Sequence, residues 1–221
     1  MDTLQVMQAR LCVRAFLDKP VGDELIREIL AAARWAPSGT NTQPWQVAVL
    51  RGDTKASLTQ RLLARREQHI DPNPDYAYYP DTWVDPYRRR RIACGKALYT
   101  ALGIARDDKD RQKIAWENNY RFFGAPVGLI FLIDKQLNQG SWMDLGMFIQ
   151  NVMLAAKALG LDTCPQASLA EYPDEVRELL GLSSEVAVVC GMALGYADMS
   201  QAVNQFRQAR EPVETFTRWY D

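Results

Sequence analysis

The sequence is poor in the residue types that most often carry metal or nucleophilic chemistry. Its 221 residues include one histidine, His69, and four cysteines that are far apart and form no C-x-x-C pair. A histidine-rich metal site, a zinc ribbon and most Ser-His-Asp triads are excluded unless that one histidine serves them. Neither a G-x-G-x-x-G turn nor a P-loop motif occurs. If the chain is an enzyme, we expect a bound organic cofactor to supply the reactive atom and no metal site.

Long apolar runs and a dominant charge are also missing. The apolar stretch Ala125 to Ile133 is 9 residues long and contains Pro and Gly, whereas a membrane-spanning helix needs about 20 residues. With 26 basic and 27 acidic residues the net charge is −1, so no overall field attracts nucleic acid or acidic lipid. Met1 to Gln5 do not resemble the start of a secretory signal. We therefore expect a cytoplasmic protein with no nucleic-acid or membrane partner.

Helix and strand patterns alternate along the chain. The strand-like runs are Gln46–Leu50, Val127–Ile133 and Val186–Met192. Apolar residues at helical spacing predict six helices. The first runs from Asp23 as N-cap to a stop before Pro37, the second begins near Thr54, and the next two span 88–102 and 107–118. The fifth runs from a capping box at Ser141–Asp144 to Leu159, and the sixth from Pro173 to Gly181. No repeat or low-complexity linker appears. This order predicts one α+β domain over 1–221, with a mixed sheet flanked by helices.

The last 24 residues, 198–221, differ from the rest because they are polar and lack clear periodicity. They nevertheless carry four aromatic rings, at Phe206, Phe216, Trp219 and Tyr220. Such a tail cannot bury these rings by itself, so it needs another surface. Docking on its own domain and wrapping around a second subunit are both open from composition alone.

Two polar segments stand out as candidate binding loops. Arg10 and Arg14 lie four residues apart, so they could hold a phosphate or carboxylate, although solvated surface arginines are the simpler reading. The second segment is the Pro-bounded loop 37–45, which combines Ser38, Gly39, Thr40, Asn41, Thr42 and Gln43. A purely structural turn would not need both side-chain amides, and this loop offers donors and acceptors to a flat, polar-edged ring.

A third segment is rich in aromatic residues. Five rings fall within twelve residues of Pro-rich loop, at Tyr76, Tyr78, Tyr79, Trp83 and Tyr87. They could pin a long loop, or they could form a lid that stacks aromatic substrates. The basic run 88–91 that follows is either a solvated helix start or a site that attracts the phosphates of a nicotinamide cofactor. Four arginines do not make a nucleic-acid site without a broader basic face.

Taken together, these motifs resemble those of the FMN-dependent nitroreductase family. The resemblance covers nearly the whole chain in the right order, and the segment 76–91 is similar to the branch that includes nitrobenzoate and nitrobenzene reductases. It rests on 10–16 (RLCVRAF), 37–45 (PSGTNTQPW), 121–127 (RFFGAPV), 146–159, 160–165 (GLDTCP), 190–196 (CGMALGY) and 207–212.

The resemblance implies a set of FMN contacts, with two sites at the interface of a homodimer whose C-terminal arms are exchanged. Arg10 would neutralise the flavin phosphate, Arg14 would lie at the pyrimidine edge, and the Ala167 N–H would face flavin N5. Cys12 stands where many members have Ser, and a thiol is a weaker donor. Gln208 replaces a basic residue beside the tail arginine. The implied cofactor-binding residues are Arg10, Leu11, Cys12, Arg14, Ser38, Gly39, Asn41, Gln43, Pro165, Gln166, Ala167, Ser168 and Arg210, with Thr40, Tyr79 and Trp83 toward a small aromatic substrate.

The activity implied is that of an NAD(P)H-dependent oxidoreductase in which flavin N5 is the reactive atom. NADH or NADPH and a nitroaromatic compound would use one pocket in turn, giving nitroso and then hydroxylamine products by two-electron steps. No side chain is needed as acid or nucleophile, which suits a chain with one histidine. The same scaffold also serves quinone or enone reduction and reductive dehalogenation, so these remain alternatives. A non-catalytic FMN redox sensor is the alternative from a different class.

Overall fold

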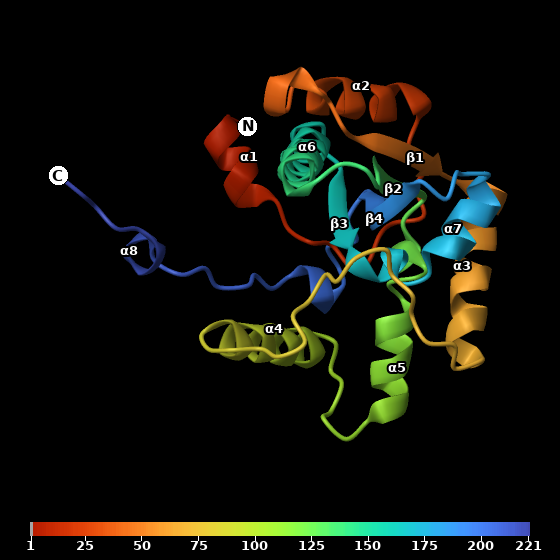
Figure 1. The fold of residues 1–221 in the computed structure, drawn as a ribbon. Coiled ribbons are helices and arrows are strands. Elements are labelled where there is room, and N and C mark those ends of the chain that lie inside the picture. Colours follow the sequence, from red (N-terminus) through yellow and green to blue (C-terminus); the bar gives the residue numbers. More distant parts are fainter. Residues whose placement is uncertain (1) are drawn as a thin grey trace.

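A four-stranded sheet lies at the centre of the computed structural model, which describes residues 2–221 (Figure 1). The strands are β1 (Gln46–Leu50), β2 (Val127–Asp134), β3 (Asp162–Gln166) and β4 (Val186–Gly195), in the order β1-β2-β4-β3. All three neighbouring pairs are antiparallel, and the one parallel pairing is an isolated bridge from Cys12 to Thr163. The expected α+β class is confirmed, with an antiparallel sheet in place of the mixed one.

Helices cover both faces of this sheet. On one face α2 and α6 pack against Leu129 and Phe131 of β2; on the other, α3 and α7 pack against Ile130 and Leu132. The faces alternate because successive side chains of a strand point in opposite directions. The helices are α1 (Thr3–Ala9), α2 (Asp23–Ala33), α3 (Gly52–Glu67), α4 (Tyr87–Ala101), α5 (Lys109–Glu117), α6 (Gln139–Ala158), α7 (Pro173–Leu180) and α8 (Val213–Phe216). None of them is both long and apolar enough to cross a membrane.

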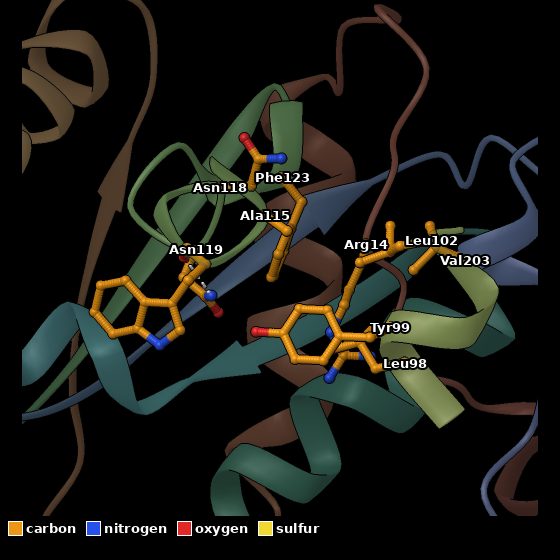
Figure 2. Close-up of a pocket in the computed structure, with 10 residues that line it drawn as sticks. Arg14, Leu98, Tyr99, Leu102, Ala115, Asn118, Asn119, Phe123 and Val203 are labelled. Carbon is orange, nitrogen blue, oxygen red and sulfur yellow. Dashed lines mark hydrogen bonds between the residues drawn. The ribbon is translucent and has the colours of Figure 1, made fainter. Parts of the chain in front are cut away.

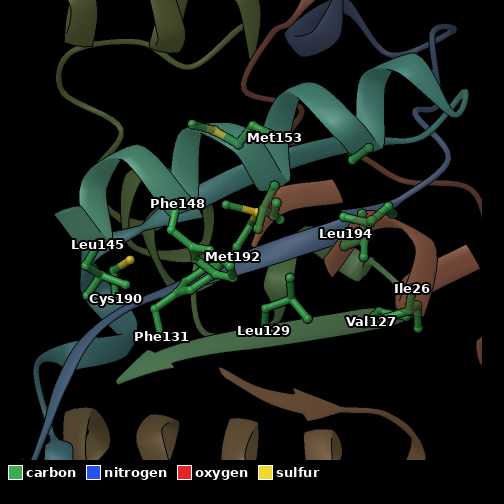
Figure 3. Packing of buried hydrophobic residues seen from close by; sticks show 14 of the residues in the cluster. Ile26, Val127, Leu129, Phe131, Leu145, Phe148, Met153, Cys190, Met192 and Leu194 are labelled. Carbon is green, nitrogen blue, oxygen red and sulfur yellow. The ribbon is translucent and has the colours of Figure 1, made fainter. Parts of the chain in front are cut away.

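The long helix α6 forms the largest part of the first core layer. Leu145 and Phe148 project from it toward β2 and β4 (Figure 3), and Val152 and Met153 belong to the same buried cluster. The capping box predicted at Ser141 is wrong, because the N-cap is Asn138 and Ser141 lies inside the first turn. Asp144 is turned instead toward another segment, described below.

Other helix boundaries follow the sequence more closely. Asp23 is the first residue of α2 and not its N-cap, which is Gly22. The Asp23 carboxylate forms an ion pair with Arg51 and interacts favourably with the positive N-terminal end of the helix dipole. Pro173 opens α7 as predicted, and Gly181 ends it with φ of 62°. In this left-handed conformation glycine avoids the Cβ clash that other residues meet.

Strand β3 was not predicted from the sequence. It reads Asp-Thr-Cys-Pro-Gln and has neither alternation nor an apolar run. It still forms a strand because it lies at the edge of the sheet, where it pairs with β4. An edge position tolerates the missing N–H of Pro165. The implied cofactor residues 165–168 therefore lie at the end of this strand and in the short 3-10 helix that follows it, Ala167–Ala170.

The C-terminal arm leaves the body of the molecule after residue 204 (Figure 1). Its root is fixed by Asn204, which accepts from the Arg14 N–H at 2.8 Å and donates to the Ala15 carbonyl at 2.8 Å. Further along, the rings of Phe216, Trp219 and Tyr220 are 71%, 84% and 85% exposed. The arm therefore does not bury these three rings on its own subunit.

A tight contact between β2 and the 3-10 helix Phe122–Gly124 yields a stability prediction. A Cβ at Gly128 would meet the buried Phe122 ring, with Cζ at 2.7 Å and Cδ1 at 2.8 Å. We expect Gly128→Ala to lower the free energy of unfolding by about 1–3 kcal/mol, measured by urea denaturation. Gly140→Ala is the control because no atom lies within 4 Å of its added Cβ. Equal stability of the two variants would contradict this packing.

Candidate cofactor site

The N-terminal motif lies directly beside β3. Cys12 forms a parallel bridge with Thr163, and the Val13 N–H donates to the Thr163 carbonyl at 3.0 Å. Two segments that are about 150 residues apart in sequence are thus neighbours in space. The structure brings Arg10, Leu11, Cys12 and Arg14 to the strand that carries Pro165 and Gln166 and continues into Ala167 and Ser168.

Two arginines surround the Cys12 position. Arg10 Nη1 lies 3.8 Å from Cys12 Sγ, and Arg14 Nη1 donates to the Cys12 carbonyl at 3.4 Å. A hydrogen bond from the Cys164 thiol, followed by the charges of Arg14 and Arg10, lowers the pKa of Cys12 well below that of an ordinary thiol despite burial. The two guanidinium groups therefore favour negative charge at this position.

Several buried polar atoms at this edge lack a protein partner. Arg10 Nε, Thr163 Oγ1, Gln166 Oε1 and Ser168 Oγ are the buried side-chain atoms within residues 2–221 that make no hydrogen bond. All four belong to the N-terminal motif or to the segment that begins with β3. A buried polar group without a partner is costly, so this grouping indicates that a polar ligand binds here. The Ala167 N–H adds a donor because it opens a 3-10 helix.

Arg14 also faces a small cavity between α4 and α5 (Figure 2). The cavity measures about 70 Å³, and Tyr99, Asn119 and Phe123 contribute to its lining. The guanidinium lies 5.9 Å from the centre of the Phe123 ring. The backbone N–H of Arg14 is therefore fixed by Asn204, and its side chain is held at the cavity. Both contacts limit the motion of Arg14.

The loop 38–43 is held in a strained conformation. Thr40, Asn41 and Gln43 have φ of 49°, 60° and 48°, which is unfavourable for residues with a Cβ. Ser38 Oγ accepts from the Gln43 N–H at 3.0 Å, and the buried Asp144 carboxylate of α6 accepts from the Gly39 N–H at 3.0 Å. Strain of this kind persists only where the surroundings enforce it, and it is common at ligand sites.

This loop is not joined to the rest of the site within one chain. No hydrogen bond in residues 2–221 links 38–43 with 10–14 or with 165–168. The side chains of Thr40, Asn41 and Gln43 are exposed, and Thr40 Oγ1 bonds only the neighbouring Gly39 carbonyl. Sequence reasoning missed Asp144 as the residue that holds this loop, since its spacing from Ser141 suggested a capping role.

The aromatic loop 71–86 is anchored at its base and open at its tip. Asp75 forms ion pairs with Arg177 at 2.7 Å and Lys135 at 2.9 Å, and it accepts from the Val188 N–H at 2.9 Å. Tyr78 and Tyr79 are 57% and 58% exposed, and Trp83 is half-buried. The pinned-loop interpretation therefore holds for the base, while the tip remains available to a ligand.

The arm residues are divided between contact and exposure. Arg207 donates to the carbonyls of Gln8 and, at 2.8 Å, Ala9, which places the arm across the end of α1. Arg210 bonds only the carbonyls of Gln208 and Ala209, so this chain does not bring it to Arg10. Its role at a phosphate stays a prediction. Arg207 and Asn204 were not singled out from the sequence, because polar tail residues carry no distinguishing pattern.

Comparison with known proteins agrees with this arrangement. A model of the Nitroreductase family matches residues 7–196. The chain belongs to the nitroreductase family. It is 43% identical over 216 residues to a 4-nitrobenzoate reductase of Pseudomonas putida, covering 97% of this chain and 93% of the relative. It is 40% identical over 213 residues to a chloronitrobenzene nitroreductase of Comamonas testosteroni, covering 96% and 94%.

A solved member of the nitroreductase family has nearly the same fold. The FMN and NADPH-dependent nitroreductase NfnB from Sphigopyxis sp. strain HMH superposes with a TM-score of 0.98 and 37% identity, over 100% of both chains. The family expected from the motifs is thereby confirmed.

The contact between Asp144 and Gly39 can be tested directly. We expect Asp144→Ala to raise hydrogen exchange of the Gly39 amide about tenfold, because a bond to a charged acceptor contributes about 1.5 kcal/mol or more. Asp144→Asn keeps an acceptor oxygen and should restore most of the protection. Hydrogen–deuterium exchange of peptides spanning 36–45 measures both. Unchanged exchange in the alanine variant would show that Asp144 does not hold this loop.

Proposed function

We propose that this chain is an FMN-dependent NAD(P)H nitroreductase that converts nitroaromatic compounds to nitroso and hydroxylamine products by two-electron steps. The observation that carries the proposal is the group of four buried polar atoms without a hydrogen-bond partner, which belong to Arg10, Thr163, Gln166 and Ser168. The names of the relatives point the same way, since the solved homologue is FMN- and NADPH-dependent and the others act on nitrobenzenes.

The residues present fit this cofactor. The unpartnered Arg10 Nε suits a phosphate oxygen, and the guanidinium groups of Arg10 and Arg14 on either side of Cys12 favour an anion. We assign the phosphate to Arg10, the pyrimidine edge to Arg14 and the ring face to 165–168, with Leu11 and Cys12 alongside. When bound, FMN supplies hydride chemistry between NAD(P)H and the nitro group. The protein contributes orientation and a cationic edge, and no side-chain nucleophile.

We further propose that the nitroreductase works as a homodimer with exchanged arms. Leu4 and Met7 of α1 and Met143 and Met147 of α6 are exposed, between 39% and 70%. These two helices contact each other, so they form one apolar surface. Such a surface and the exposed rings of the arm together favour a second copy of the chain as partner. The loop 38–43 and Arg210 would then complete the FMN site from the partner subunit. The cytoplasmic location and single-domain organisation expected from the sequence stay predictions.

The activity is tested by an anaerobic spectrum of the purified protein. We expect flavin absorption that bleaches with NADPH or NADH and returns on addition of 4-nitrobenzoate. Arg14→Ala should bind FMN about tenfold more weakly or slow its reduction, because a charge-assisted hydrogen bond is lost. Arg27→Ala, on the exposed side of α2, is the control. Protein that takes up no FMN would refute the proposal. Bleaching that only a quinone, an enone or a halophenol reverses would favour one of the alternative acceptors, and very slow bleaching would favour a sensor.

The dimer is tested by deleting residues 205–221. We expect the full chain to elute as a dimer and the deletion variant as a monomer or a weak dimer in light-scattering chromatography, since the arm rings lose their partner surface. The root of the arm at Asn204 is retained, and unchanged far-ultraviolet circular dichroism is the control for folding. A deletion variant that remains fully dimeric would show that the arms are not exchanged.

A further inference from the structure

A chain of aromatic rings leads from the core of the protein to its surface. Tyr76 and Tyr78 have ring centres 6.2 Å apart, Tyr78 and Tyr79 4.6 Å, and Tyr79 and Trp83 5.6 Å. The inner end is fixed because the Tyr76 hydroxyl donates to the Val189 carbonyl at 2.6 Å. The outer rings keep open faces, so they offer stacking surface that the protein itself does not use.

The inner part of this chain lies next to the candidate FMN site. The Tyr76 hydroxyl bonds the carbonyl of Val189, and two residues further along β4 Gly191 pairs with Gln166 of β3. Gln166 Oε1 is one of the four buried side-chain atoms within residues 2–221 that make no hydrogen bond at the candidate site. The aromatic chain therefore starts beside the strand that carries the candidate site, and Tyr78 leads from Tyr76 to the exposed rings.

Three of the four arginines in the run 88–91 are paired with carboxylates. Arg88 and Arg89 pair with Asp85 at 3.2 and 3.7 Å. Arg90 pairs with Glu211 of the arm at 2.7 Å. Arg88 and Arg89 share the single carboxylate of Asp85, so these three arginines carry one more charge than their two partners, but each of them is held in an ion pair at the start of α4.

Arg91 differs from them. No carboxylate of residues 2–221 lies within 4 Å of its guanidinium, which instead lies 5.3 Å from the centre of the Trp83 ring. This contact places the Arg91 guanidinium at Trp83, the outer end of the aromatic chain. A guanidinium over an aromatic ring keeps donors free at its edge, and these match the geometry of a carboxylate.

We propose that Tyr79, Trp83 and Arg91 form an acceptor subsite that selects a planar aromatic carboxylate. The rings stack on the arene, and Arg91 donates to its carboxylate. The inference rests on the proposed nitroreductase activity and names the substrate class that the relatives leave open, since one is named for a carboxylated nitrobenzene and the other for a chlorinated one. Arg91 is a specificity residue here, because it contacts the substrate away from the nitro group.

The test compares two acceptors of nearly equal shape, 4-nitrobenzoate and the uncharged 4-nitrobenzamide. In Arg91→Gln we expect the ratio of kcat/KM for the carboxylate over the amide to fall about fivefold, the range of a partly exposed ion pair. The change should be mainly in KM, and added salt should reduce the ratio only in the wild type. Arg89→Gln is the matched control because it removes the same charge from the same run, and its ratio should not change.

Two further readouts distinguish the ways in which the inference can fail. Calorimetric titration of the holoprotein with benzoate and benzamide measures the subsite without turnover, so loss of benzoate binding in Arg91→Gln supports the subsite even if nitroarene reduction is absent. An unchanged ratio, or an equal fall in Arg89→Gln, would overturn the inference and leave the nitroreductase proposal intact. Slower reduction of Arg91→Gln by NADPH but not by NADH would also overturn it, because the anion bound would then be the cofactor phosphate.

Discussion

The edge strand β3 is the element on which the candidate site depends. On one side it pairs with β4, and on the other it accepts the segment that follows α1 through the Cys12–Thr163 bridge. An edge strand with a proline near its end leaves backbone and side-chain groups unpaired. In this chain Thr163 Oγ1 and Gln166 Oε1 of β3 are buried without a partner, as is Arg10 Nε of the segment that bridges β3, so the incomplete edge of the sheet is also where a polar ligand fits.

Helix α6 supports the site from behind. Its inner face packs on the sheet, and its Asp144 holds the strained loop 38–43. Its Trp142 makes an edge contact with Tyr76, with ring centres 4.6 Å apart. One rigid element therefore sets the position of a binding loop and of the lid. Because close-packed helices transmit small displacements, the packing of α6 and the geometry of the site are expected to vary together.

The charges of the site are arranged for binding more than for acid–base chemistry. Arg10 and Arg14 lie beside Cys12, and the ion pairs that Asp75 forms with Lys135 and Arg177 are structural. This pattern suits a flavoprotein, in which the cofactor carries the reaction and the protein tunes its electrostatics. Specificity then has to come from the surface that we propose the acceptor meets, which is the aromatic loop and Arg91, the one arginine of the run 88–91 that has no carboxylate partner within residues 2–221.

Local chemistry made much of this protein readable from its sequence. Three strands, the start and end of α7, the α+β class and the family followed from apolar spacing, Pro and Gly positions, and motif order, all of which act over a few residues. The tertiary structure decided what depends on distant partners. Residues 162–166 form a strand because β4 is available to pair with them. The Asp144 carboxylate accepts from the Gly39 N–H and does not cap its own helix. Among the described residues Arg91 has no carboxylate partner, whereas its neighbours in the run 88–91 do. These outcomes depend on pairings between residues far apart in sequence, and a local sequence pattern does not predict the energy of such contacts.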